Sequence, residues 1–288
     1  MDSTDLRIFS AVARFGGMSR AADHLNTVQS NVTARIRLLE DQLGLPLFHR
    51  HSRGATLTQA GERLLPYAEQ IQHLIDDATK ALKDTGRPTG SLTLGSLETT
   101  ASLRLSHHLA DFAATYPDVD LILRTGTTCE LVQSVLDRTV EGAFVCGPVD
   151  HPALVQTMAF REELALLTAP CIKSPDELHN PKLVVLRSGC SYRERLEALL
   201  RRRGIQAVRL LEFGTLDAIL ACVAAGIGVT LLPHSLVPAG ARITIHALPP
   251  ADAQVETLFI RRRDSFVSTA MNAFIGMTCP APARAAAE

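Results

Sequence analysis

Several signatures of secreted, membrane-bound and metal-binding proteins are missing from this sequence. The six cysteines lie far apart with no C-x-x-C pair, which fits neither a zinc ribbon nor a disulfide-rich secreted scaffold. The first residues include Asp2 and Asp5 and lack the basic and apolar segments of a secretory signal. The longest apolar run, 218–232, is shorter than the roughly 20 residues that cross a bilayer. We therefore expect a cytoplasmic protein without a membrane-spanning segment.

Motifs for metals and cofactors are also missing. The ten histidines show neither H-E-x-x-H nor H-x-x-E-H spacing. Gly226 and Gly228 follow a helical segment, whereas the glycines of a dinucleotide-binding loop open a helix. We expect no metal, no cofactor and no catalytic activity. The alternative is an enzyme that uses Cys190 as nucleophile with His234 or His246 as its base, although no local motif joins these residues.

The distribution of charge indicates where nucleic acid would bind. The length of 288 residues fits about two domains, and the net charge is only −1. Residues 1–60, however, hold seven arginines, no lysine and five acidic residues, for a net charge of +2. Four of these arginines lie between 35 and 53. Since nucleic-acid-binding domains are basic, we expect this segment to contact the nucleic acid.

Three short helices and a hairpin are predicted at the N-terminus. The first helix ends at Gly16, Ser19 caps the second helix, and the third helix ends near Gly44. The tight turn between the second and third helices is typical of a helix-turn-helix. Two short apolar segments flank the basic tip at 50–54 and predict a wing. The apolar stripe of the third helix consists of Val32, Ile36 and Leu39.

The polar face of the third helix is the predicted reading surface. In a helix-turn-helix the N-terminal residues of this helix meet base edges in the major groove. Glutamine pairs with adenine, arginine pairs with guanine, and a small apolar side chain meets the thymine methyl group. Arginines beside this face and in the wing are placed for phosphates. The predicted DNA-binding residues are Gln29, Ser30, Thr33, Ala34, Arg35, Arg37, Arg50 and Arg53.

A narrow apolar seam follows the wing. Its residues recur at steps of four and three, a pattern that favours pairing with another helix. Pro66 lacks an N–H group and predicts a kink or a restart of the helix. The alternative is an amphipathic helix that lies on its own domain. The predicted dimerisation residues are Leu64, Ala68, Ile71, Ile75, Ala78 and Leu82.

Strand-like and helical segments alternate through the rest of the chain, a pattern typical of α/β folds with a mostly parallel sheet. We expect two α/β lobes with a cleft between them, and a late strand that returns to the first lobe. The expected domains are a winged helix-turn-helix of α+β class at 1–58, a linker and dimerisation helix at 59–89, and an α/β domain at 90–288. Lobe I spans about 90–161 and 262–278, and lobe II spans about 162–261.

The N-terminal motifs resemble the signature of LysR-type transcriptional regulators over about 45 residues. The resemblance implies a homodimer or homotetramer that binds operator DNA, with a two-lobed effector domain like a periplasmic binding protein. It departs from the family pattern at Val28, where Ser or Thr is usual, and at Ala34, where Arg is common. The matching residues are Ser19-Arg20-Ala21-Ala22, Leu25-Asn26, Gln29-Ser30, Val32-Thr33, Ile36, Leu39-Glu40, Leu43-Gly44, Leu47-Phe48, Arg50, Leu57-Thr58 and Ala60-Gly61.

The resemblance also places a small-molecule effector between the lobes. Ligands of open α/β sheets bind at the carboxyl ends of strands. The N–H groups at a helix start, together with Arg193, favour a carboxylate or another anion, although the hydroxyl residues have an alternative role as helix caps. The effector-binding residues implied by position are Ser96, Thr99, Thr100, Thr127, Thr128, Cys190, Ser191, Tyr192, Arg193 and Thr215.

Two further alternatives stay open. The thiol of Cys190, at a helix start beside an arginine, is in a setting that lowers a thiol pKa and favours redox sensing, although buried unreactive cysteines are common. The chain is also compatible with a solute-binding protein whose helix-turn-helix is idle. Alanine at Thr33 and Arg37 separates these two functions, because only a DNA reader loses operator binding.

Overall fold

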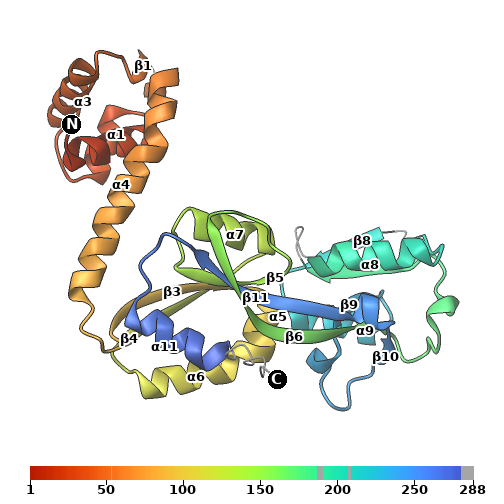
Figure 1. Cartoon of the computed structure of the whole chain (residues 1–288). Coiled ribbons are helices and arrows are strands. Elements are labelled where there is room, and N and C mark those ends of the chain that lie inside the picture. Colours follow the sequence, from red (N-terminus) through yellow and green to blue (C-terminus); the bar gives the residue numbers. More distant parts are fainter. Residues whose placement is uncertain (53, 187–190, 207–208, 280–288) are drawn as a thin grey trace, which may run out of the picture. The chain divides into compact units, whose positions relative to one another are not determined.

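The computed structural model describes residues 1–52, 54–186, 191–206 and 209–279. It divides into two compact units, Met1–Thr85 and Gly86–Glu288 (Figure 1). Arg53 and Cys190, two of the predicted site residues, lie outside the described residues.

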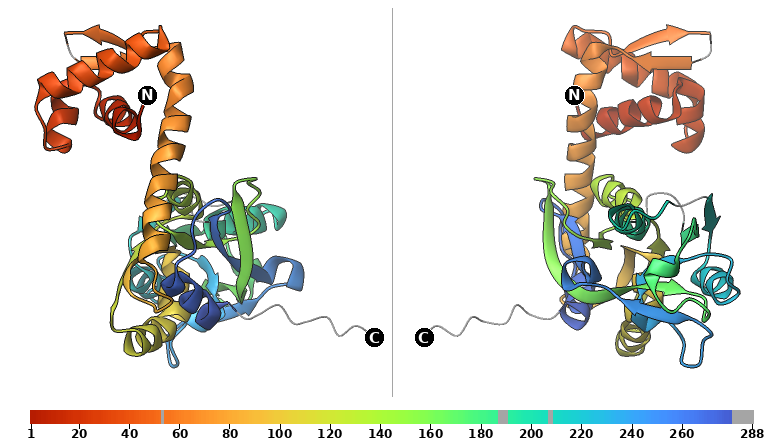
Figure 2. Two further views of the ribbon diagram at one scale, coloured as in Figure 1. Left: turned by 60° about the vertical axis from the view of Figure 1, so that its left-hand side comes forward. Right: turned by 90° about the vertical axis from the view of Figure 1, so that its right-hand side faces the viewer.

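The first unit is a winged helix-turn-helix followed by a long helix, as expected. The β1–β2 hairpin pairs antiparallel, with Phe48 opposite Leu57, and is seen beside the helices in Figure 2. A single core of Phe9, Val12, Ile36 and other apolar side chains joins the helices to this hairpin. Its elements are α1 (Ser3–Phe15), α2 (Met18–His24), α3 (Gln29–Leu43), β1 (Phe48–His51), β2 (Gly54–Leu57) and α4 (Gln59–Lys83).

The glycines predicted the ends of α1 and α3 correctly, but the residue predicted to cap the start of α2 was wrong. Gly16 and Gly44 end α1 and α3 with φ of +67°, a backbone conformation that glycine adopts without steric strain. The prediction that Ser19 caps α2 is wrong, because α2 begins at Met18 and Ser19 lies inside the helix. Gly17 is its N-cap and provides no side-chain hydrogen bond.

The long helix α4 passes through Pro66 without a break, so the predicted restart there is wrong. Proline removes only one backbone hydrogen bond, and both flanking segments are held independently. The Thr58 hydroxyl caps the start by accepting from the Gly61 N–H at 3.1 Å, and Ala68 is fully buried in the core of the first unit. Farther along, Gln72 Nε2 donates to the Ser3 carbonyl at 2.8 Å. These contacts keep one helix on both sides of the proline.

In the described part of the second unit, a seven-stranded mixed sheet connects the two lobes. Strands β3, β4 and β5 are parallel, and β11 runs antiparallel to β5 and β6. The strand order is β10-β6-β11-β5-β3-β4, with β9 also paired to β6, while β7 and β8 form a separate parallel pair. The strands are β3 (Gly90–Ser96), β4 (Val119–Thr125), β5 (Gly142–Cys146), β6 (Leu154–Thr168), β7 (Lys182–Leu186), β8 (Arg209–Phe213), β9 (Thr230–Pro233), β10 (Thr244–Ala247) and β11 (Gln254–Arg262).

Strand β6 is the main element that the sequence pattern underestimated. Only residues 164–167, in its second half, form the continuous apolar run of a buried strand. The first half pairs with β11, with Arg262 opposite Leu154. The second half pairs with β9 and β10. Figure 1 shows β6 and β11 extending from one lobe to the other, so these strands fix the lobes to each other.

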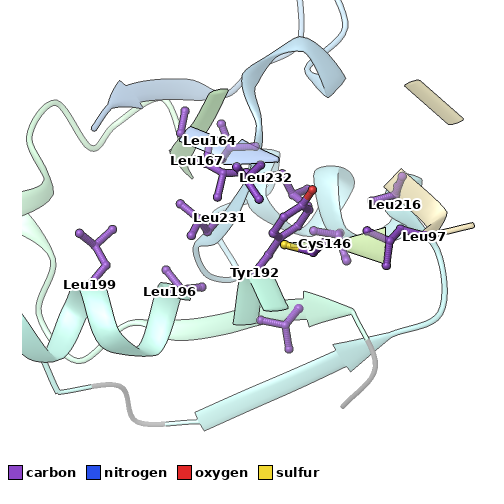
Figure 3. Packing of buried hydrophobic residues seen from close by; sticks show 14 of the residues in the cluster. Leu97, Cys146, Leu164, Leu167, Tyr192, Leu196, Leu199, Leu216, Leu231 and Leu232 are labelled. Carbon is purple, nitrogen blue, oxygen red and sulfur yellow. The ribbon is translucent and has the colours of Figure 1, made fainter. Parts of the chain in front are cut away.

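Helices cover the sheets and build two apolar cores. One core packs Phe112, Phe144, Phe259 and Phe274 around strands β3, β5 and β11. The other core continues through both lobes, and Figure 3 shows the Tyr192 ring among leucines of β9 and α8. The helices are α5 (Glu98–Thr100), the π-helical turn η1 (Ala101–Leu105), α6 (Ser106–Thr115), α7 (Thr128–Leu136), the turn η2 (Pro175–Glu177), α8 (Ser191–Arg202), α9 (Leu216–Ala224), the turn η3 (His234–Leu236), α10 (Pro250–Ala253) and α11 (Thr269–Thr278).

The buried His246 makes the stability of the second unit depend on pH. Its side chain is 8% exposed, and Nε2 lies 2.8 Å from the Thr168 hydroxyl. Burial lowers the pKa of His246 below its ordinary value, while Glu177 raises it and Arg203 lowers it to smaller extents. The unfolded chain therefore takes up a proton at a higher pH than the folded chain. The free energy of unfolding consequently falls as the pH drops through about 6.5.

We predict that His246→Gln flattens this dependence, measured as the free energy of unfolding in urea between about pH 8 and about pH 5. His234→Gln is the matched control, because His234 is exposed and bonded only to the Glu163 carbonyl in the described structure. Equal pH dependence in the His246 variant and the unchanged protein would contradict this assignment.

Candidate DNA-binding surface and ligand cavity

The predicted reading face is on the surface of α3. Gln29, Ser30, Ala34 and Arg37 are exposed, and Thr33 is half-buried. Among the described residues, the Arg37 guanidinium has no hydrogen bond or ion pair, which leaves its N–H groups available to a guanine edge or a phosphate.

The start of α3 departs from the usual capped geometry. Val28 is the N-cap and makes no side-chain hydrogen bond, and its side chain is 64% exposed. Instead, the Asn31 side-chain amide donates to the Thr27 hydroxyl at 3.0 Å. Neither Val28 nor Asn31 was predicted to contribute to this surface, because the apolar periodicity places only the stripe and the face opposite to it.

The Arg35 side chain connects α3 to the start of α1 through ion pairs. Its Nη1 lies 3.0 Å from Asp5 Oδ1 and 3.4 Å from Asp2 Oδ2. The Asp5 side chain is buried, so this pair stabilises a carboxylate that has left water. The prediction of a phosphate contact treated Arg35 as a free charge. A partner 30 residues away in sequence could not be identified from the local pattern.

Glu40 organises the connection from α3 to the wing. Its Oε1 accepts from the backbone N–H groups of Leu47 at 2.8 Å and Phe48 at 3.2 Å. Its Oε2 pairs with Arg50 at 3.1 Å, so the side chain of this predicted phosphate ligand is anchored at the base of the wing. The LysR-like pattern contains Glu40 and Arg50 but does not reveal that they form a pair.

The exposed face of α4 differs from the predicted seam. Leu64 and Ala68 pack against the core of their own unit, and the fully buried Ala68 is not accessible to a partner helix. Exposed instead are Tyr67, Leu74 and the predicted Ile71, Ile75, Ala78 and Leu82. The series 67, 71, 74 and 78 has the same steps of four and three; it shares 71 and 78 with the predicted series and has 67 and 74 in place of 68 and 75. Periodicity alone did not decide between the two.

A cavity of about 40 Å³ lies in the second unit, where strand ends of both lobes meet helix starts. Lobe I contributes residues after β3 and β4, and lobe II contributes residues after β7 and β8. The described residues that line the cavity are Leu97, Glu98, Thr99, Gly126, Thr127, Leu186, Ser191, Tyr192 and Gly214. Four of the predicted effector residues are therefore brought together: Thr99, Thr127, Ser191 and Tyr192.

Three of the other predicted hydroxyl residues, Ser96, Thr128 and Thr215, have structural partners. The Ser96 hydroxyl donates to the Leu97 carbonyl at 3.0 Å, and the Thr128 hydroxyl accepts from the Cys146 N–H at 3.2 Å. Thr215 caps α9 through the Ala218 N–H at 3.4 Å, and Thr100 is buried outside the lining. The alternative that these residues act as ordinary caps holds for Thr215. Thr127 both caps α7 and lines the cavity.

Arg193 lies outside this cavity, and the prediction that it adds positive charge there is wrong. Its Nε pairs with Glu197 at 3.0 Å, and its Nη1 lies 4.0 Å from Glu212. It lines a separate open groove between α8 and the β8 segment. Successive side chains of a helix point about 100° apart, so Arg193 lies on a different face of α8 from Tyr192. Spacing after a strand does not determine which of these faces meets the cavity.

The charge of the described cavity lining is negative, whereas a positive charge was expected from Arg193. Glu98 is the single acidic residue of the described lining, which contains no Lys, Arg or His. Leu97, Glu98 and Gly126 lie in the strand-end loops expected to hold the effector but were not chosen as binding residues, and Leu186 and Gly214 were not predicted. Their common feature is a position at or directly after the carboxyl end of a strand, and this feature was available in the sequence.

The described part of the chain contains no grouping of three or more His, Cys, Asp or Glu side chains suited to a metal ion. Within the same described ranges, no helix has the length and apolar character needed to span a bilayer. The alternative base His246 is buried against Thr168, which uses its Nε2 within the core.

Comparison with known proteins identifies both units. A family model described as "Bacterial regulatory helix-turn-helix protein, lysR family" matches residues 3–62, and "LysR substrate binding domain" matches 85–278. The regulator YofA of Bacillus subtilis is 46% identical over 278 residues, which cover 96% of this chain and 97% of YofA. GltR, also of Bacillus subtilis, is 43% identical, covering 94% of this chain and 93% of GltR.

Solved structures share the fold. A full-length OxyR variant of Pseudomonas aeruginosa has a TM-score of 0.66 at 21% identity, covering 97% of this chain and 96% of that chain. CbnR, a LysR family transcriptional regulator, has a TM-score of 0.55 at 24% identity, covering 96% of this chain and 100% of that chain. The chain therefore belongs to the LysR family of bacterial helix-turn-helix regulatory proteins.

Proposed function

We propose that this chain is a cytoplasmic transcriptional regulator, and not an enzyme, that binds operator DNA as a homodimer or homotetramer. The helix α3 enters the major groove, and the wing contacts the adjacent backbone. A small molecule in the cavity of the second unit modulates this binding. The domains that carry these roles are 1–58 for DNA, 59–89 for the linker helix and 90–288 for the effector.

The exposed surface of α3 from Gln29 to Arg37, where Arg37 has no partner among the described residues, is the observation that supports this proposal most strongly. It presents an amide, two hydroxyl groups, a methyl group and a guanidinium on one helix surface, and these groups recognise base edges. A solved structure of the same fold, CbnR complexed with its target DNA, has a TM-score of 0.53 and supports the use of this unit on DNA.

Operator binding is tested with DNA from the promoter region next to the gene that encodes this chain. Fluorescence anisotropy should detect a fragment containing an interrupted dyad that binds about 1,000-fold more tightly than a scrambled fragment. Equal affinity for both fragments would leave only non-specific binding and would contradict the proposal.

The exposed apolar face of α4 supports assembly through this helix. Leu74 is 67% exposed and forms no part of the core of its own unit, so Leu74→Glu should leave the fold intact. We predict that this variant dissociates the dimer, because a carboxylate would be buried among apolar side chains at the pairing seam. Multi-angle light scattering during size-exclusion chromatography gives the mass of each species.

The matched control for this experiment is Lys80→Gln, which makes the same one-unit change in net charge on the opposite, exposed face of α4. It should remain dimeric. A Leu74→Glu variant that keeps the dimer mass over the same concentration range would show that α4 is not the pairing element.

A further inference from the structure

The cavity in the second unit combines two opposite electrostatic preferences. Glu98 lines it, and among the described residues its carboxylate has no hydrogen bond, no ion pair and no basic neighbour in the lining. A carboxylate in this setting attracts a cationic donor. A ligand that is only an anion would place two negative charges in one small space.

Groups that favour an anion lie in the same lining. Ser191 begins α8, a helix of 12 residues, and the N–H groups at the start of such a helix are not used within it. Helix starts bind carboxylates through these N–H groups and the helix dipole. The start of α7 contributes less, because Thr127 and Glu130 already form a capping box there.

Thr99 is an independent indication of a ligand. It is 3% exposed and lines the cavity, and its hydroxyl has no hydrogen-bond partner in the described structure. A hydroxyl that has no protein partner and lines a cavity can donate to, or accept from, a molecule bound there. A ligand in the cavity would provide the missing hydrogen bond.

On the basis of the proposed regulatory function, we propose that the effector is a small α-amino acid bound as its zwitterion. The ammonium group lies against Glu98, and the carboxylate lies at the start of α8 with the hydroxyls of Ser191 and Thr99. Leu97 and Leu186 contact an apolar side chain. The cavity of about 40 Å³ has room for about three water molecules, which selects ligands at the small end of this class.

The first test compares whole zwitterions with their halves. Isothermal titration calorimetry on the full chain uses L-alanine, L-valine and L-leucine, each beside its decarboxylated amine and its deaminated acid; the other proteinogenic amino acids follow. At least one amino acid should bind about 10-fold more tightly than either analogue, since each analogue loses a charge-assisted hydrogen bond. A deaminated acid that binds as tightly as its amino acid, or no binding by any amino acid, would overturn the proposal.

The second test assigns the ammonium contact. Glu98→Gln should lower the affinity for the amino acid about 10-fold and raise the affinity for the deaminated acid, because the variant removes a negative charge that repels the carboxylate. Glu194→Gln is the matched control, because Glu194 is also an acid in the first turn of a helix but is exposed and outside the lining. Unchanged or tighter amino-acid binding by Glu98→Gln would contradict the assignment.

The third test separates ligand binding from folding. Thr99→Val should weaken amino-acid binding without lowering the melting temperature of the free protein, because the lost hydroxyl has no partner among the described residues. A lower melting temperature with unchanged ligand affinity would show a structural role only. Operator binding is measured on the unchanged protein alongside. An unchanged protein that binds its operator but no amino acid overturns this inference alone, whereas an unchanged protein that does not bind its operator overturns the proposed function.

Discussion

Replacing both Thr33 and Arg37 with alanine will lower operator affinity by about 100-fold or more and leave effector binding unchanged. Both residues lie on the surface of α3, and neither has a hydrogen-bond partner or ion pair among the described residues. Each specific contact of a side chain with a base edge contributes about 1–3 kcal/mol, so the loss of two contacts gives this factor. Fluorescence anisotropy with the operator and a scrambled fragment measures it.

The contribution of Arg37 to sequence recognition is separated from its charge by a matched variant. Arg7→Ala removes the same charge from the same unit, at an exposed position of α1. It should weaken operator and scrambled DNA equally and slightly, as a loss of general electrostatic attraction does. If Arg7→Ala and Arg37→Ala reduce operator affinity to the same extent, Arg37 does not recognise bases.

Replacing Gly61 with alanine will destabilise the DNA-binding unit by about 3 kcal/mol, because the added methyl group has no space. A Cβ at Gly61 would lie 2.3 Å from the Leu47 carbonyl oxygen and 2.8 Å from a methyl carbon of Leu57. The Leu47 carbonyl is fixed by the Thr58 N–H at 2.9 Å, so it cannot move without losing the connection between the wing and α4. Urea denaturation measures the change.

Gly276→Ala is the control for this substitution. Gly276 also lies in a helix, α11, and a Cβ there meets no atom within 4 Å. Alanine should stabilise that helix by about 0.5–1 kcal/mol, because glycine loses more backbone entropy on folding. Destabilisation by both substitutions to a similar extent would indicate a general intolerance of alanine and not the predicted steric conflict.

The sequence predicted the elements that depend on short-range periodicity. The buried stripe of Val32, Ile36 and Leu39 placed α3, and glycines placed the ends of α1 and α3, because left-handed backbone at a helix end favours glycine. These features depend on residues within about one turn of each other. The helix-turn-helix and its exposed face were accordingly correct.

Features that depend on distant partners were not predictable in this way. Arg35 pairs with Asp5, and Arg50 pairs with Glu40, so two arginines assigned to phosphates also stabilise the protein itself. On α4, contact with α1 buries Ala68 and leaves Leu74 exposed, whereas the apolar pattern alone fits either face. In each case the sequence pattern does not reveal which other element packs against the residue.

For the same reason, the sequence predicted the position of the ligand cavity but only some of the residues that line it. Position after a strand end brought Thr99, Thr127, Ser191 and Tyr192 into one lining. The positive charge expected from Arg193 is not in the described lining, because the Arg193 side chain pairs with Glu197, and Glu98 is the charged residue there. The direction of a side chain at the first turn of a helix depends on the packing of that helix, which the sequence pattern does not contain.

The affinity of the purified protein for its own promoter fragment, measured as the salt concentration increases, tests operator binding through α3 most directly. We expect a complex of paired subunits on the dyad, with log affinity falling linearly against log salt at about −0.9 per phosphate contacted. The same α3 surface must be required, so the Thr33 and Arg37 double variant loses the difference between operator and scrambled DNA. A monomer that binds neither fragment at low salt would contradict operator binding by this chain.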